Sequence, residues 1–276
     1  MADDGSKNTG EDSRTGEGPA GPVVVAIGAS AGGLQALQSF FAAIPDNTGA
    51  AFVVIVHLDP KHRSELASIL STRTRMPVSQ VDARERLQPD HVYVIPPDHR
   101  LQLFDHEISA SGFEEPPRQR TPVDAFFRSM AEQLGDGFAV ILSGAGSDGA
   151  LGVRAVKEAG GIILVQDPAE AEYASMPRSA IETGPADFVL PVRELVTKLA
   201  DLMRVKKTVS ASVRHNVNEE DLDRIFALLH TRTGHDFSKY KRSTVLRRIA
   251  RRMQVARTAD MKKYYEFMRE NAAEAQ

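Results

Sequence analysis

The chain has 276 residues, of which 42% are hydrophobic and 26% charged, with a net charge of −3. These proportions are typical of a soluble globular protein and exclude a fibrous or wholly disordered chain. The absence of cysteine excludes disulfides, thiolate zinc sites and cysteine nucleophiles, and we expect no metal and no cofactor. No apolar run approaches the roughly 20 residues that span a bilayer, and no signal peptide is visible. We therefore expect a cytoplasmic protein without membrane insertion.

Charge is divided unevenly along the chain. Seventeen of the 34 Lys and Arg residues follow Leu202, but only nine of the 37 Asp and Glu residues do, so this segment carries +8 and the rest −11. Such an asymmetry is typical of regions with different partners. We expect a disordered tail over 1–21, which is rich in Gly, Ser, Asp and Glu, and an α/β domain over 22–205. A polar linker over 206–218 and a helical unit over 219–276 complete the predicted organisation.

From Pro22 onward, short apolar runs alternate with amphipathic stretches, which is typical of β-α-β units. The predicted strands are Val23–Ile27, Phe52–Val56, Val92–Ile95, Phe138–Leu142, Ile162–Val165 and Phe188–Leu190. The predicted helices are Leu34–Ile44, Leu66–Leu70, Val123–Leu134, Gly149–Ala159 and Arg193–Val205, with a hairpin near Leu101–Glu115. The strand runs are continuously apolar, as in a parallel sheet covered on both faces. We expect a doubly wound, mostly parallel α/β domain followed by a small all-helical domain.

The first chemical motif is Gly28-Ala29-Ser30-Ala31-Gly32, which fits Gly-x-Ser-x-Gly between a predicted strand and a predicted helix. Small neighbours permit a sharp turn that presents the serine at the carboxyl edge of the sheet. The amide groups that follow, at a helix N-terminus, can receive an oxyanion. A structural or phosphate-cradling glycine turn is the competing interpretation. A dinucleotide fingerprint would need glycine where Ser30 stands, which weakens the cofactor interpretation.

A base and an acid follow two further predicted strands. His57 comes directly after the second strand, and Asp148 lies in the glycine-rich turn after the fourth. Since parallel strands end at one edge of the sheet, both side chains can meet Ser30 there. Taken singly, His57 fits an ordinary surface residue and Asp148 a helix cap. Asp59 is a rival acid, although only two residues from His57 it is expected to point away.

These motifs resemble the chemotaxis protein-glutamate methylesterases of the CheB type over roughly residues 23–202. The resemblance rests on Ile27–Gly33, Ile55–Leu58, Thr121–Asp124, Leu142–Gly149 and the stretch from Gln166 to Pro177. It implies that Ser30 is the nucleophile, His57 the general base and acid, and Asp148 the residue that orients His57. It also implies an oxyanion held by backbone amides near Ala31 and Ala145, where the family often has Thr and Met. The chain order Ser, His, Asp argues against the α/β-hydrolase fold.

The resemblance implies hydrolysis of methyl esters on glutamate side chains of a methylated chemoreceptor or receptor-like signalling protein, and often deamidation of receptor glutamines. The family's catalytic domain commonly follows a receiver domain, for which residues 1–21 leave no room. We therefore expect no control by aspartyl phosphorylation on this chain. A catalytically idle signalling scaffold with the same fold is the alternative function. A nucleotide-binding α/β domain is a weaker third.

The basic end of the chain resembles the N-terminal helical domain of CheR-type receptor methyltransferases, through Thr233–Thr244 and Tyr264–Phe267. Two arginine pairs belong to this resemblance: Arg247 with Arg248, and Arg251 with Arg252. In that family the basic helices help to dock the receptor, and the competing interpretation is a solvated helix face. Few aromatics are interleaved with the basic residues, so we expect no nucleic-acid binding. Without a donor-binding glycine-rich loop, the chain resembles the front of a methylesterase–methyltransferase fusion, and we expect no methyl transfer.

Overall fold

The structure, a computed structural model, describes residues 21–57, 64–116, 119–184, 186–215, 219–237, 242–271 and 274. Except for Gly21, the predicted disordered tail lies outside the described residues, and so does the rival acid Asp59. Within the described ranges every helix is too short or too polar to cross a bilayer. In the same ranges no three His, Asp or Glu residues gather into a group that would hold a metal ion.

Strands and helices alternate along the first two thirds of the chain, as the apolar rhythm predicts, except over residues 78–112, where β3 to β7 follow one another. The strands are β1 (Val23–Ala29), β2 (Ala50–Val56), β3 (Val78–Gln80), β4 (Glu85–Arg86), β5 (His91–Val94), β6 (His99–Phe104), β7 (Glu107–Gly112), β8 (Phe138–Ile141), β9 (Ile162–Gln166) and β10 (Phe188–Leu190). The helices are α1 (Gly33–Ala43), α2 (Leu66–Ser71), α3 (Pro122–Gln133), α4 (Ala150–Ala159), α5 (Ser175–Glu182), α6 (Val192–His215), α7 (Glu219–Thr233), α8 (Arg242–Val255) and α9 (Met261–Glu270). β3, β4 and α5 are additions to the predicted set, because β3 and β4 are too short to show a period and α5 contains Pro177.

The main sheet has seven strands in the order β10-β9-β8-β1-β2-β5-β3, and every neighbouring pair is parallel. The chain begins at the centre with β1, builds one half of the sheet through β2, β3 and β5, and then crosses back to β8. Such a reversal is the switch point of a doubly wound sheet, outside which ligands bind at the carboxyl ends of the strands. The predicted fold class is confirmed.

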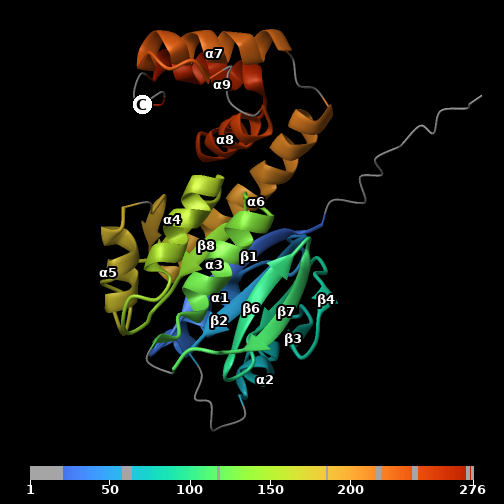
Figure 1. Ribbon diagram of the computed structural model, residues 1–276, viewed down its shortest axis with the longest axis vertical. Helices are drawn as coiled ribbons and strands as arrows, with labels where there is room; N and C mark the ends of the chain where they lie inside the picture. The colour runs from blue at the N-terminus through green and yellow to red at the C-terminus, as the bar shows by residue number, and fades with distance from the viewer. Residues whose placement is uncertain are drawn as a thin grey trace, which may run out of the picture.

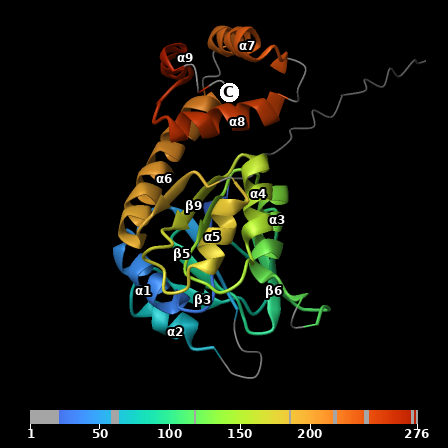
Figure 2. The same cartoon turned by 90° about the vertical axis from the view of Figure 1, so that its left-hand side faces the viewer.

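Helices cover both faces of this sheet because side chains of each strand alternate between two cores (Figures 1 and 2). In β1, Val25 and Ile27 belong to the core under α1, α2 and α6. Val24 and Ala26 belong to the core under α3, α4 and α5. A strand buried on both faces has no polar side to expose, which explains the continuous apolar runs in the sequence.

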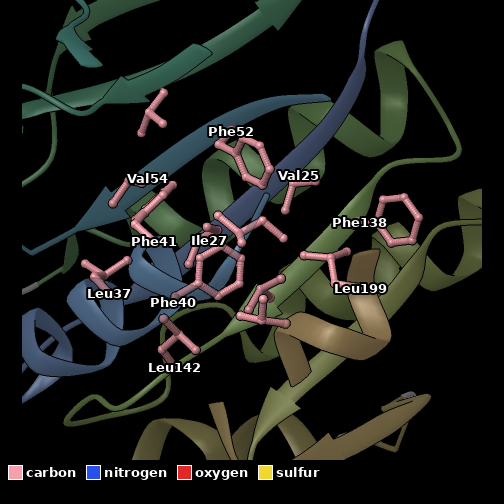
Figure 3. Close-up of a cluster of buried hydrophobic side chains, with 14 of the residues drawn as sticks. Val25, Ile27, Leu37, Phe40, Phe41, Phe52, Val54, Phe138, Leu142 and Leu199 are labelled. Carbon is pink, nitrogen blue, oxygen red and sulfur yellow. The ribbon is translucent and has the colours of Figure 1, made fainter. Parts of the chain in front are cut away.

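The first core holds the helix that follows the serine turn. Figure 3 shows Phe40 and Phe41 of α1 beside Phe52 of β2, with Phe138 and Leu199 extending the cluster. The three ring pairs meet edge to face with centroids 5.3, 6.3 and 5.9 Å apart. Each such pair contributes about 0.5–1.5 kcal/mol beyond the burial of its area. The last turn of α1 is therefore packed firmly against β2, and this fixes the helix that follows the serine turn.

The second, smaller sheet is antiparallel and has the order β4-β7-β6. Its hairpin turns at Asp105 and His106, whose φ angles of 45° and 61° are both left-handed, as a two-residue hairpin turn requires. Leu101, Leu103 and Ile108 point from this sheet into the second core. The hairpin predicted near Leu101–Glu115 is confirmed.

The helical end of the chain differs from the prediction in one respect. Helix α6 runs to His215, ten residues beyond its predicted end at Val205, so residues 206–215 of the predicted linker are helical. Residues 216–218 lie outside the described part. The polar sequence of residues 206–215 is compatible with a helix, because a helix that bridges two domains needs no apolar face.

Helices α7, α8 and α9 pack around a core of their own, to which Leu222, Ile225, Ile249, Met253 and Tyr264 contribute. This unit lies at one end of the molecule's long axis, and α2 lies at the other (Figures 1 and 2). The predicted all-helical unit at the end of the chain is confirmed.

Candidate functional site

The register of the two central strands brings Ser30 and His57 together. β1 and β2 pair in parallel with Ala29 opposite Val56, and Ser30 and His57 are the next residues along each strand. Neighbouring strands lie about 4.8 Å apart, so the two backbones leave the sheet side by side at its carboxyl edge. The fold thus places a serine and a histidine at the switch point.

Asp148 approaches the same edge from the other side of β1, in the turn between β8 and α4. Its Oδ2 lies 2.8 Å from Nε2 of His57, a hydrogen bond whose carboxylate is buried and whose imidazole is 38% exposed. Since Nε2 faces Asp148, Nδ1 is the other ring nitrogen and the one that could accept a further proton. Among the described hydrogen bonds none joins Ser30 Oγ to His57, and such contacts are often loose before substrate binds.

The carboxylate of Asp148 is held by the start of another helix. The amides of Val123 and Asp124 donate to its Oδ2 and Oδ1 at 3.0 and 2.9 Å. These are amides of the first turn of α3, which begins at Pro122 and has no earlier turn to supply acceptors for them. A negative carboxylate is favoured at this positive helix end. The Thr-Pro-Val-Asp segment is therefore the support of Asp148.

Ser143 ties the loops of the site together, although nothing in its sequence pattern had assigned it a role. Its carbonyl oxygen accepts the amide of Ser30 at 3.0 Å. Its hydroxyl donates to the carbonyl oxygen of Ala31 at 3.1 Å and accepts the amide of Tyr173 at 3.0 Å. Ser143 is buried, so these bonds are protected from water. The position of the residues around Ser30 depends on this side chain.

Two amides predicted to hold an oxyanion are placed at the rim of the site. Among the described hydrogen bonds, the amides of Ala31 and Ala145 donate to no protein acceptor, whereas those of Gly144 and Gly146 next to Ala145 do. Ala31 is followed by Gly32, the left-handed N-cap of α1, so its amide stands at a positive helix end. Both amides are thus available to a developing negative charge.

Close approach at this edge requires glycine. A Cβ on Gly144 would lie 3.0 Å from Cβ of Ser30 and 2.4 Å from Sδ of Met176. Because real Cβ atoms do not approach other atoms so closely, a larger residue here would displace the serine turn. Packing around Ser30 therefore explains the glycine at position 144.

Comparison with known families adds to this geometry. Residues 25–199 match the family described as CheB methylesterase. The chain belongs to the CheB methylesterase family. Residues 220–276 match the family described as the CheR methyltransferase all-alpha domain, so the chain has the domain order of a CheB/CheR-type fusion.

The relatives of this CheB family member differ in how much of their own length the matched region makes up. A protein of Leptospira interrogans, provisionally named protein-glutamate methylesterase/protein-glutamine glutaminase, is 35% identical over 62% of this chain and 90% of its own length. A protein of Photorhabdus laumondii named protein-glutamate methylesterase/protein-glutamine glutaminase is 32% identical over 64% of this chain, which spans 51% of that protein. The crystal structure of the Thermotoga maritima CheB methylesterase catalytic domain superposes with a TM-score of 0.62. It is 31% identical and covers 66% of this chain and 98% of that domain.

The arginines of the two pairs in the CheR-type unit differ in their exposure to solvent. Arg248 is exposed, and the side chain of Arg247 lies outside the described part. Arg252 binds Glu274, with Nε 2.8 Å from Oε1. Arg251 is buried, which corrects its prediction as an exposed docking side chain.

The burial of Arg251 arises from the contact between the two domains. Its Nη2 lies 2.6 and 2.9 Å from the carboxylate oxygens of Asp187, and its Nε donates to the carbonyl oxygen of Gly161 at 2.7 Å. Gly161 and Asp187 precede β9 and β10, so this contact is at the amino edge of the CheB sheet. The CheR-type helices therefore lie at the edge opposite Ser30.

Proposed function

We propose that the chain is a serine hydrolase that removes methyl esters from glutamate side chains of a chemoreceptor or receptor-like signalling protein. The observation that carries this proposal is the pair of His57 Nε2 and Asp148 Oδ2, 2.8 Å apart beside Ser30 at one sheet edge. A bare glycine turn or a helix cap has no need of a histidine paired with a buried carboxylate. The substrate class follows the names that the relatives carry.

The proposed reaction is an acyl transfer in two halves. Ser30 Oγ attacks the ester carbonyl while Nδ1 of His57 takes its proton, and Asp148 stabilises the resulting imidazolium. The tetrahedral oxyanion is held by the amides of Ala31 and Ala145, at about 3 kcal/mol per donor in comparable sites. His57 then gives the proton to the departing methoxide, and methanol leaves an acyl-enzyme.

Water completes the second half of the reaction. His57 takes a proton from water as that water attacks the acyl-enzyme, and then returns the proton to the departing Ser30 Oγ. The glutamic acid released ionises to its carboxylate, and Ser30 and His57 are restored. A glutamine side chain would form the same acyl-enzyme with ammonia as the leaving group. Deamidation at the same site accords with the glutaminase part of the relatives' names.

Replacing the nucleophile tests this proposal. We expect Ser30→Ala to lower methanol release from a methyl-esterified chemoreceptor fragment by about 10⁴-fold or more, because the covalent route is lost. Ser68→Ala, on the exposed surface of α2, is the matched control and should retain the rate.

A serine-reactive phosphonate separates a wrong receptor from an idle scaffold. Labelling of Ser30 in the unchanged chain, without methanol release, would keep the hydrolase and change the receptor. Absence of both labelling and release would favour the scaffold function.

A further inference from the structure

The helix that supports Asp148 is itself held by the helix that follows Asp148. Asp124 stands in the first turn of α3, and its Oδ1 accepts the amide of Gly152, in the first turn of α4, at 2.6 Å. The amide of Gly149 also lies near this carboxylate and lowers its pKa. Asp148, just before α4, accepts two amides from α3 in return. Each helix N-terminus is thus capped by a carboxylate that belongs to the other.

A charged carboxylate at position 124 is energetically unfavourable, because the site is buried. The residue is only 3% exposed, and its cationic neighbour, Arg128 Nη2, is 3.9 Å away on a half-exposed side chain. Burial, and then the nearby charge of Asp148, raise the pKa of Asp124, while the amides act against this rise. Asn or Ser would cap a helix without placing two carboxylates side by side. A carboxylate here needs a reason other than capping alone.

Packing makes the two helix ends a single rigid unit. A Cβ on Gly152 would lie 2.7 Å from Cβ of Phe127 and 3.1 Å from Cα of Asp124, so α3 and α4 touch backbone to backbone. A Cβ on Gly149 would lie 2.9 Å from Cγ1 of Val123. Because neither helix end has room to shift alone, the direction of the Asp148 carboxylate depends on both caps.

We propose that Asp124 is a positioning residue for the proposed reaction, which acts by locking the N-termini of α3 and α4 so that Asp148 Oδ2 faces His57 Nε2. Asp124 would touch neither substrate nor Ser30 and acts through Asp148 alone. The inference rests on the proposed hydrolase function. It predicts that the geometry of the His57–Asp148 hydrogen bond depends on a carboxylate outside the triad.

The test compares Asp124→Ala and Asp124→Asn with a change to another carboxylate that accepts a backbone amide, at the other edge of the sheet. Asp90 is the matched control, because its Oδ1 accepts the amide of Gly49 at 2.5 Å, far from the site along the strand direction. The first readout needs no substrate: it is the downfield proton resonance of the His57 Nε2–H that bonds to Asp148. The second is the rate at which a phosphonate labels Ser30. The third is kcat and KM for methanol release.

We expect Asp124→Ala to shift or abolish the His57 resonance and to lower both the labelling rate and kcat by about 10- to 100-fold, the cost of a misplaced catalytic group. KM should stay unchanged, since Asp124 touches no substrate. Asp124→Asn, which keeps an acceptor oxygen for Gly152, should recover part of the rate. Asp90→Asn should leave resonance and rates at the values of the unchanged chain, even where it lowers stability.

A folded Asp124→Ala chain with the original resonance and labelling rate would overturn the proposal. If Asp124→Ala does not fold, Asp124→Asn decides in the same way, because an unchanged resonance and rate there would show that the charge is dispensable. The resonance reports on His57 and Asp148 directly. It therefore tests Asp124 even if no receptor ester proves to be hydrolysed, and a failure of the proposed function would appear separately as absent Ser30 labelling in the unchanged chain.

Discussion

Single residues of this chain carry strain and burial that no sequence pattern reveals, and His106 is an example. It occupies a left-handed position in the β6–β7 turn, with φ 61°, and its Nδ1 is buried without a hydrogen-bond partner among the described residues. Burial is the largest cause that lowers the pKa of His106, and Arg86 lowers it further, while Asp105 and Asp136 raise it. The folded chain therefore resists protonation of this ring.

This gives a pH dependence with a definite sign. The pKa of His106 is lower in the folded chain than the ordinary value of about 6.5, so the unfolded chain binds a proton more readily. The free energy of unfolding is therefore at its full value above about pH 6.5 and falls as the pH is lowered below it. Asn tolerates a left-handed φ and does not titrate, so His106→Asn should shrink the loss of unfolding free energy between about pH 7.5 and about pH 5. Some loss remains, since burial lowers the pKa of His91 as well.

Urea unfolding at the two pH values measures this loss. His230→Asn, on an exposed face of α7, is the control and should leave the loss in place. An undiminished loss in His106→Asn would contradict the assignment to His106.

At the scale of elements, the site depends on how closely α3 and α4 pack. Helical periodicity predicts each helix, because apolar residues recur on one face of it. It does not predict that the two N-termini meet, since that contact joins residues about 28 positions apart. Gly152 is the residue at which this contact is tightest, and the sequence alone presents it as one more glycine near a helix start.

Gly152→Ala tests this packing, because close packing predicts that the substitution lowers the free energy of unfolding instead of raising it. In an exposed helix interior, replacing Gly by Ala stabilises by about 1 kcal/mol. Here the new Cβ would lie 2.7 Å from Cβ of Phe127, and overpacking costs about 1–3 kcal/mol. We expect a net loss of up to about 2 kcal/mol in the free energy of unfolding, measured in urea, together with slower phosphonate labelling of Ser30.

Gly112→Ala is the matched control for this change. A Cβ on Gly112 would meet nothing within 4 Å, so its substitution should alter stability by no more than about 0.5 kcal/mol. A stabilising effect of Gly152→Ala would show that the two helices do not pack as closely as described.

At the scale of the whole molecule, the two domains meet through a buried ion pair at the edge away from the site. The carboxylate of Asp187 also accepts Lys157 Nζ at 2.7 Å and the amide of Ile163 at 2.9 Å, so Arg251 completes a network that already exists in the CheB domain. Arg257 adds a partly exposed ion pair with Asp201 of α6. The orientation of the helical unit is set by Arg251 more than by this exposed pair.

Arg251→Met should therefore loosen the helical unit and leave the chemistry unchanged. Removing one partner of a buried pair costs about 3 kcal/mol, which we expect as a loss of unfolding free energy and as faster proteolysis within residues 216–276. The rate of Ser30 labelling should not change, because Ser30 lies at the opposite edge of the sheet. Arg248→Met, an exposed arginine on the same helix, should leave both unchanged. A large fall in Ser30 labelling would show that the two edges are coupled.

Most strands and helices and the doubly wound class could be predicted from the sequence, because apolar periodicity is local and each long buried strand shows it. The short strands β3 and β4 and the helix α5 could not. The sequence also placed Ser30, His57 and Asp148 at three strand ends, since a residue after a parallel strand can only stand at the carboxyl edge. The sequence did not reveal which ring nitrogen of His57 meets Asp148, that Ser143 bonds to the loops around Ser30, or that Asp124 caps the opposite helix. The extent of α6 and the burial of Arg251 were decided by the tertiary structure. These features depend on contacts between residues far apart in the chain. Their side chains are polar or small, so they produce no periodic hydrophobic pattern in the sequence.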